Sequence, residues 1–125
     1  MILRIGTVTN VYPREGKVRV LYPDRDETSV KLPLLAWEFK MPEVGAAVVT
    51  LHMDGRSNGF CLGEYWNDEK MPEIQEGIKY RKDIGKDAYI SWNNGRMEIV
   101  SPEIVFRTST GTISTEKMQN LVQED

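Results

Sequence analysis

The feature that most constrains this chain is a seven-residue repeat between residues 90 and 113. Within each repeat two apolar residues stand two positions apart, which is the spacing of side chains on one face of a β-strand. The pairs are Ile90 and Trp92, Met97 and Ile99, Ile104 and Phe106, and Gly111 and Ile113. The repeat therefore predicts a row of short strands, each too short to cover its own apolar face.

The turns of the repeat predict how these strands pair. Asn94-Gly95 is typical of a two-residue hairpin, because both central residues of a type I′ turn need a positive φ. Pro102 disfavours a second tight hairpin, so we expect the chain to step around a corner there, either as a meander or as a wound prism. The pairs expected across Asn94-Gly95 are Trp92 with Met97 and Ile90 with Ile99 on one face, and Ser91 with Glu98 on the other.

Seven apolar side chains then line one face of a narrow sheet and need a cover. Burying each is worth roughly 1.5 to 3 kcal/mol before ordering entropy is subtracted, and monomers rarely expose so large an apolar patch. The cover is either the N-terminal part of the same chain or the same face of other copies. A narrow strip closes most economically around a threefold axis. We therefore predict a homotrimer with the core residues Ile90, Trp92, Met97, Ile99, Ile104, Phe106 and Ile113.

Residues 1–65 predict a small barrel. The stretch "KVRVLY" places Val18, Val20 and Tyr22 on one strand face, Gly6 indicates a bulge or bend, and Pro33 ends the third strand. Five strands with a long connection after the third are typical of an OB-fold barrel, although the count also fits an SH3-like barrel. The expected strands are 4–12, 17–22, 28–32, 46–53 and 59–65.

The predicted fold class is therefore all-β, with a five-stranded OB-fold barrel (1–65) followed by a short trimeric β-prism or β-helix (79–114). Residues 66–78 are acidic, contain Pro72 and Gly77, and are interpreted as a linker. Residues 115–125 form a tail in which Thr115 is a candidate cap for a short helix. That helix would place Met118, Leu121 and Val122 on one side.

Composition and charge narrow the function. The net charge of −3 argues against a general nucleic-acid binder, whose affinity comes mostly from Lys and Arg. Cys61 is the single cysteine, so it forms neither an internal disulfide nor a cysteine metal site, and its apolar neighbours predict burial. The N-terminal stretch has no basic leader with a long apolar run, so export by the general pathway is not expected.

The sequence offers few residues that could act as a catalytic base or nucleophile. His52 lies between Leu51 and Met53, and we expect it on the solvent side of a strand rather than in an active site. Acidic residues at 24, 26 and 27 are interpreted as an ordinary polar turn rather than a calcium site. We predict no enzyme activity, no catalytic residues, no cofactor and no metal.

An alternative function is an OB-fold module that binds single-stranded nucleic acid or an oligosaccharide. In that case Tyr12, Tyr22 and Trp37 are the candidate stacking platforms. Such a groove normally has a basic surround, whereas residues 1–65 carry equal numbers of basic and acidic side chains. Charge therefore disfavours this alternative.

Several short motifs keep a characteristic order and spacing along the chain. They are Gly6-x-Val8, Val18-x-Val20, Leu32-Pro33, Pro42-x-x-Gly45, Gly59-Phe60 and Gly63-x-Tyr65. Together they resemble the baseplate assembly protein V family, the central spike proteins of contractile phage tails. These are similar to the spikes of type VI secretion and of phage-tail-like bacteriocins. Family members carry an N-terminal OB domain followed by a trimeric β-helix or β-prism, and the resemblance covers nearly the whole chain.

The resemblance implies a structural protein of a virion tail baseplate or tail-like particle, assembled in the bacterial cytoplasm. Its partners would be the baseplate hub and tail tube proteins, with transient contact to the target cell envelope and none to nucleic acid. This chain departs from some relatives because its short linker leaves no room for a lysozyme domain. Its single histidine also excludes the His-x-His iron site of other relatives. The short prism suggests a separate spike-tip protein.

Overall fold

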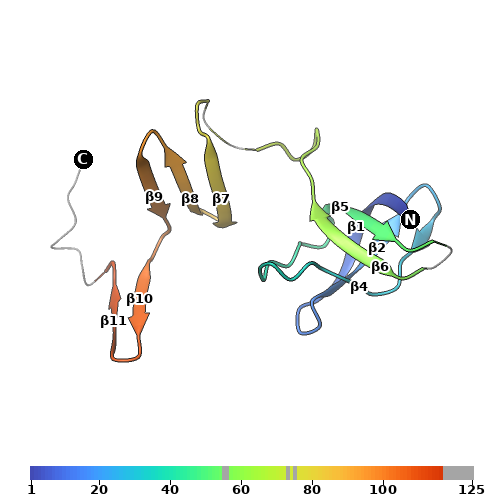
Figure 1. Cartoon of the computed structure of the whole chain (residues 1–125), viewed down its shortest axis with the longest axis horizontal. Coiled ribbons are helices and arrows are strands. Elements are labelled where there is room, and N and C mark those ends of the chain that lie inside the picture. Colours follow the sequence, from blue (N-terminus) through green and yellow to red (C-terminus); the bar gives the residue numbers. More distant parts are fainter. Residues whose placement is uncertain (55–56, 73, 75, 117–125) are drawn as a thin grey trace. The chain divides into compact units, whose positions relative to one another are not determined.

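The computed structural model describes residues 1–54, 57–72, 74 and 76–116 of the chain (Figure 1). The protein is all-β: the described residues form antiparallel sheets and contain no helix, which confirms the predicted class. Contacts divide the chain into two compact units, Met1–Pro72 and Glu73–Asp125, called unit 1 and unit 2 below. The division falls inside the segment interpreted as a linker, and the exact domain boundaries stay a prediction.

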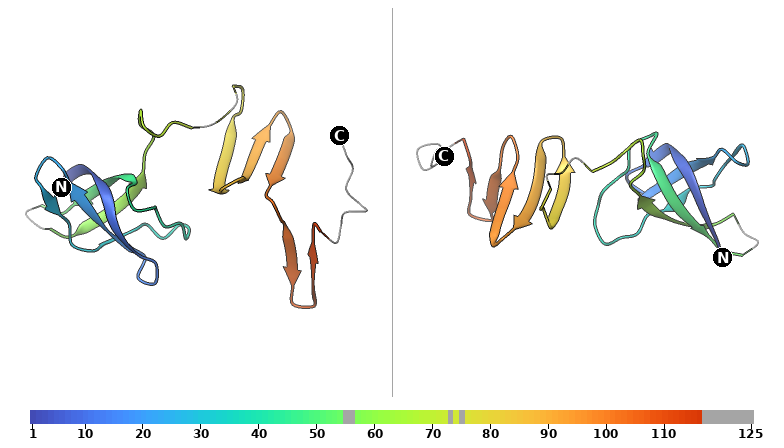
Figure 2. Two further views of the ribbon diagram at one scale, coloured as in Figure 1. Left: turned by 180° about the vertical axis from the view of Figure 1, so that it is seen from behind. Right: turned by 90° about the horizontal axis from the view of Figure 1, so that it is seen from above.

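Unit 1 is one antiparallel sheet whose path runs β3-β2-β1-β5-β6, with β4 pairing to β2 (Figure 2). Sequence alternation predicted the main strands well, because in β2 every second residue is buried. The strands are β1 (Ile2–Tyr12), β2 (Lys17–Tyr22), β3 (Glu27–Thr28), β4 (Leu32–Pro33), β5 (Ala47–His52) and β6 (Gly59–Glu64).

The predicted third strand over 28–32 is interrupted, and this prediction was wrong in detail. The hydroxyl of Ser29 accepts a hydrogen bond from the backbone N–H of Val20 at 2.9 Å. This N–H is therefore not available to a backbone carbonyl of the next strand. The same hydroxyl donates to the carbonyl of Val30 at 2.7 Å. A serine side chain that bonds to the backbone competes with regular pairing, and two two-residue strands, β3 and β4, flank the break.

The core of unit 1 is formed by residues that alternate along its strands. At 2% exposure or less, each of these side chains has left water almost completely. Cys61 is among them, as its apolar neighbours predicted. The core residues are Val8, Val18, Val20, Tyr22, Leu32, Val48 and Cys61.

Gly6 does not mark a bulge, which was one of the two roles predicted for it. The irregularity in the pairing of β1 with β2 lies between Val8 and Asn10, not at Gly6. A Cβ atom on Gly6 would lie 2.4 Å from Cγ1 of Val20 and 2.6 Å from the carbonyl oxygen of Leu21. Glycine is therefore required here because β2, which pairs with β1, approaches this position too closely for any side chain.

The hydrogen-bonded ladder of unit 1 is open in the described part of the chain. Its path ends at β3 on one side and at β6 on the other. A single isolated parallel bridge joins Leu34, just after β4, to Cys61 of β6. The backbone N–H of Leu34 also donates to the carbonyl of Gly16 at 2.9 Å. These contacts hold the segment after β4 close to both β2 and β6.

Unit 2 consists of a three-stranded meander, β7-β8-β9, and a separate hairpin, β10-β11 (Figure 1). The expected corner at Pro102 is present, since no ladder joins β9 to β10 among the described residues. The strand at 80–85 was not predicted from the sequence. The strands are β7 (Tyr80–Gly85), β8 (Ala88–Asn93), β9 (Arg96–Val100), β10 (Val105–Thr108) and β11 (Gly111–Ser114).

A local turn lies at the start of the segment interpreted as a linker. Near the start of the predicted linker, the side-chain oxygen of Asn67 accepts hydrogen bonds from the backbone N–H groups of Glu69 and Lys70 at 2.8 and 2.9 Å. This is an Asx turn. The helix predicted around Met118, Leu121 and Val122 lies outside the described residues.

Candidate assembly surface

The β8-β9 hairpin has the register that the sequence predicted. Its turn residues Asn94 and Gly95 have φ values of 49° and 80°, as a type I′ turn requires. Directly opposed residues of an antiparallel pair point to the same face. The pairs are Ile90 with Ile99, Trp92 with Met97, and Ser91 with Glu98.

β7 enlarges this apolar face in a way that sequence reasoning missed. It pairs Tyr80 with Trp92 and Lys82 with Ile90, so an aromatic ring and a lysine stem join the face. The strand carries mostly polar residues, and only Tyr80 and Ile84 offered an apolar signal. The alternation Tyr80, Lys82 beside Arg81, Asp83 would have been a usable but weak indication of a strand.

The opposite face of the meander is mostly polar, although Tyr89 and Val100 pair directly on it. The Nε of Arg81 donates to Asp83 at 3.0 Å, and its guanidinium lies 3.8 Å from the centroid of the Tyr89 ring. On the same face, within β9, Arg96 forms an ion pair with Glu98 at 3.0 Å. Partly exposed ion pairs contribute little stability, but they supply charged side chains with partners. The charged side chains of this face are therefore already paired.

Exposure is inverted between the two faces of the meander. Ser91, on the polar face, is 6% exposed, whereas Trp92 and Ile99, on the apolar face, are 45% and 54% exposed. Among the described residues of unit 2, Ser91 is the only buried one. A sheet that leaves its aromatic and aliphatic face in water while shielding a serine is incomplete by itself.

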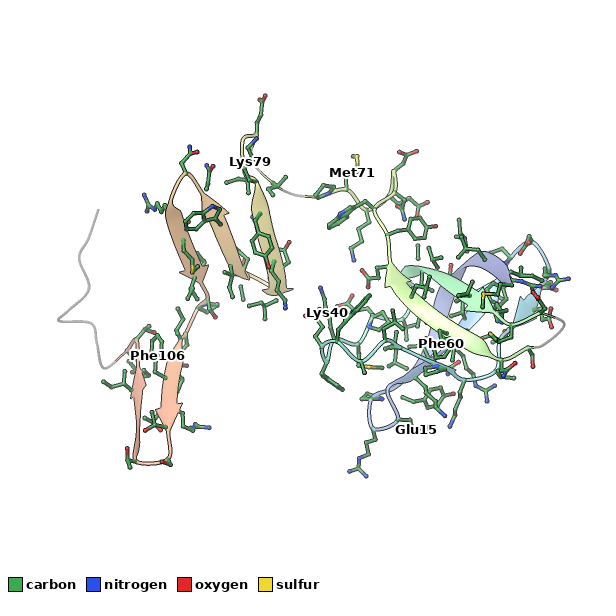
Figure 3. All side chains as sticks on the ribbon, in the orientation of Figure 1. Glu15, Lys40, Phe60, Met71, Lys79 and Phe106 are labelled. Carbon is green, nitrogen blue, oxygen red and sulfur yellow. The ribbon has the colours of Figure 1, made fainter. Side chains whose placement is uncertain are left out.

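The β10-β11 hairpin repeats this arrangement. Phe106 pairs directly with Ile113, and both side chains are half exposed, at 56% and 50% (Figure 3). At the base of the hairpin, the backbone N–H of Thr115 donates to the carbonyl of Ile104 at 2.9 Å. The structure thus brings four of the seven predicted core residues together on the meander and two on the hairpin, with Ile104 at the hairpin base.

His52 is placed differently from the prediction. It is 5% exposed and lies on the inner face of β5, because Val48, Thr50 and His52 share that face and Val48 belongs to the core. Its Nδ1 is 3.0 Å from the carbonyl oxygen of Ser57. A carbonyl only accepts, so Nδ1 carries the proton. The solvent-facing interpretation of His52 was wrong.

The hydrogen bonds of His52 continue into a buried polar cluster. Its Nε2 is hydrogen-bonded to the hydroxyl of Tyr22 at 2.6 Å, and that hydroxyl is also hydrogen-bonded to Thr50 at 2.8 Å. Burial raises the pKa of Tyr22 above its usual value, although the Thr50 hydrogen bond and Arg4 act in the opposite direction. Tyr22, Thr50 and His52 each have at least one hydrogen-bond partner in this cluster.

The aromatic residues considered for base stacking do not form one surface. Tyr22 is 2% exposed and is therefore unavailable to a ligand that stacks. The ammonium of Lys31 lies 4.3 Å from the ring centroid of Tyr12. Trp37, in the connection between β4 and β5, is 80% exposed. This arrangement removes one of the three stacking platforms from the alternative function.

Metal-ligating residues do not gather within the described ranges: no group of three or more His, Cys, Asp or Glu side chains could hold an ion there. In the same part of the chain, no helix has the length and apolar character needed to span a membrane.

Comparison with protein-family models and with curated proteins finds no match to this chain.

Proposed function

We propose that the protein is a trimeric structural spike at the baseplate hub of a contractile phage tail or phage-tail-like injection apparatus. The observation that carries the proposal is the exposed apolar face of unit 2, which has a satisfied polar face behind it. In the proposed trimer, three copies of this face meet on a common axis. The core residues are those predicted from the repeat, Ile90, Trp92, Met97, Ile99, Ile104, Phe106 and Ile113.

Energetics favours identical copies as the cover. Each half-exposed side chain that leaves water contributes about 1 kcal/mol or more, and three chains bring three identical faces to one interface. Closed rotational symmetry then satisfies every face at once and leaves none exposed. The two narrow sheets of unit 2 would form a short β-prism.

Unit 1 fits the N-terminal barrel of such a spike. If β3 and β4 are counted as one interrupted strand, the order of pairing matches a five-stranded OB-type barrel. The parallel bridge between Leu34 and Cys61 supports closure of that barrel between its third and last strands. The close crossing at Gly6 supports the strong bend of the first strand that a small barrel needs.

The connection between β4 and β5 is the surface that we assign to the hub contact. Trp37 and Phe39 are 80% and 77% exposed there. A pocket of about 220 Å³ includes Trp37 in its lining and combines apolar residues such as Leu34 and Leu62 with charged residues such as Glu64. Exposed aromatic anchors next to a pocket of mixed polarity are compatible with a protein–protein contact. The barrels would therefore bind the hub and tail tube, and the prism would lead into a separate tip protein.

The proposed role is mechanical. A dry prism with continuous strands resists axial load, while sheath contraction supplies the force that drives the spike into the target envelope. No catalytic step is required of this chain. The protein would be assembled in the bacterial cytoplasm and would remain in the virion or tail-like particle.

The functional test uses the particle itself. Deleting the gene in the producing cell should leave sheathed tails without ordered baseplates in negative-stain electron micrographs, and the wild-type chain should restore them. Ile99→Asp should fail to restore them, whereas Glu98→Ala, on the polar face, should succeed. Complete particles in the deletion strain would refute the proposal. Retention of the purified chain on single-stranded DNA at moderate salt would favour the alternative function.

A further inference from the structure

One end of the unit 1 sheet holds a second pocket, which the proposed assembly does not use. It measures about 320 Å³ and lies where β1 begins and where β2 and β5 end. Its volume is within the range of small-molecule sites. The lining residues that matter here are Arg4, Tyr22, Arg25, Glu27, His52 and Ser57.

The inner wall of this pocket is formed by side chains that are already hydrogen-bonded within the protein. Tyr22 and His52 line it, and their polar atoms are engaged with one another, with Thr50 and with the Ser57 carbonyl. The Ser29 hydroxyl, also in the lining, is engaged with the backbone of Val20 and Val30. A ligand therefore meets a preorganised surface that need not rearrange.

Two guanidinium groups supply the charge of the pocket. The Arg4 guanidinium lies over the Tyr22 ring, with its central carbon 5.6 Å from the centroid. Arg25 enters from the turn that follows β2. Within the described part of the chain, neither arginine forms an ion pair. Among the described lining residues Glu27 is the one acidic residue, against the two arginines.

We propose that this pocket binds an oxyanion, a carboxylate or phosphate group, of a small molecule. A guanidinium presents parallel N–H donors that match the oxygens of either group. The hydroxyls of Thr28 and Ser57 add further donors at the rim, and Ile2 and Val30 receive the apolar part of the ligand. The proposal is independent of the trimer, because every residue named lies in unit 1.

The test is a titration of the full-length chain with inorganic phosphate and, separately, with butyrate, at constant ionic strength held with chloride. Amide chemical shifts are followed by NMR. We expect saturable shifts at Thr28, Ser29 and Ser57 with affinity in roughly the millimolar range, as such small ligands allow. The probe that saturates first identifies the group. Shifts that stay linear, or that spread over basic residues generally, would overturn the proposal.

A matched pair of variants completes the test. Arg25 lies exposed in a turn, so Arg25→Gln should fold normally and weaken binding by about tenfold or more. Arg14→Gln, in the exposed β1-β2 turn outside the pocket, should leave binding unchanged. Equal weakening by both variants would show non-specific attraction to positive charge and would also overturn the proposal.

Discussion

Units 1 and 2 are built from the same kind of short antiparallel strands, but unit 1 buries its apolar side chains and unit 2 leaves them exposed. Unit 1 has its own core, which includes the buried side chains of Val8, Val18, Val20, Leu32 and Val48. Unit 2, within the described ranges, buries Ser91 alone. The comparison shows that strand alternation specifies which residues share a face, whereas curvature of the sheet decides whether the chain itself can cover that face.

The physical basis of the difference lies in the connections. In unit 1, β1 pairs with the distant strand β5, and the bridge between Leu34 and Cys61 brings the segment after β4 to β6. In unit 2 the strands are joined by tight turns and pair only with their sequence neighbours. A flat meander has one layer, and a hydrophobic core needs at least two. The second layer of unit 2 must therefore come from outside the sheet.

The largest effect is expected from a charge on the apolar face of unit 2. Ile99→Asp would place three carboxylates in one dry core, and unpaired buried charge costs several kcal/mol each. We expect dissociation to monomers in sedimentation velocity runs. Glu98→Ala is the control, because it removes only a half-exposed ion pair with Arg96 on the other face. Equal effects of the two variants would contradict the face assignment.

A cavity created by a substitution in the core of unit 1 should lower the stability of that unit without affecting assembly. Leu32 is fully buried, so Leu32→Ala should lower the free energy of unfolding of unit 1 by about 2 to 5 kcal/mol. The measurement is hydrogen exchange of the β5 amides in urea. This loss should not depend on protein concentration, unlike the stability of an assembled unit 2. Leu3→Ala is the control at 63% exposure, and an equal loss there would show that the core is misassigned.

The strand crossing in unit 1 gives a third prediction. Gly6→Ala forces a methyl group against Val20 and the Leu21 carbonyl, so β2 must shift, at a cost of about 1 to 3 kcal/mol. Chemical unfolding measures the change. Gly111→Ala meets no atom within 4 Å and should be nearly neutral. A neutral Gly6→Ala variant would mean that β1 and β2 do not approach so closely.

The polar cluster gives a predicted change similar in size to that of Gly6→Ala. Tyr22→Phe removes the hydroxyl that bonds to His52 and Thr50, and a buried polar group left without a partner costs roughly 1 to 3 kcal/mol. Thermal unfolding at fixed protein concentration measures this loss. The exposed Tyr80→Phe variant should lose nothing. If both variants matched the wild type, the Tyr22–His52 hydrogen bond would have no energetic role.

The same tyrosine predicts an alkaline limit to stability. Burial raises the pKa of Tyr22, so the neutral phenol is favoured in the folded state. Its contribution is fully present below the ordinary pKa of 10.0 and is lost as the pH rises through the higher folded value. The wild type should thus lose stability more steeply than Tyr22→Phe above about pH 10. Parallel curves for the two proteins would contradict this.

Local sequence signals predicted much of both units. The Asn94-Gly95 turn and the spacing of Ile90, Trp92, Met97 and Ile99 were sufficient for the register of β8 with β9. This succeeds because a two-residue turn leaves one way to pair its flanks, and the period of two then assigns every side chain.

Other features depended on contacts that no local pattern contains. β5 carries apolar residues on both faces, so alternation alone could not orient His52. The hydroxyl of a buried Tyr22 needs a partner, and this requirement was the available signal. β7 was missed because most of its residues are polar, and the contact of Arg81 with the Tyr89 ring of β8 depends on a pairing that no local pattern contains.

The most direct test of the account is the mass of the full-length chain in solution, by size-exclusion chromatography with multi-angle light scattering. A trimer of the 14.3 kDa chain should give about 43 kDa, with Trp92 fluorescence shifted to the blue by burial. A stable species of 14.3 kDa would contradict the claim that identical copies cover the apolar face of unit 2.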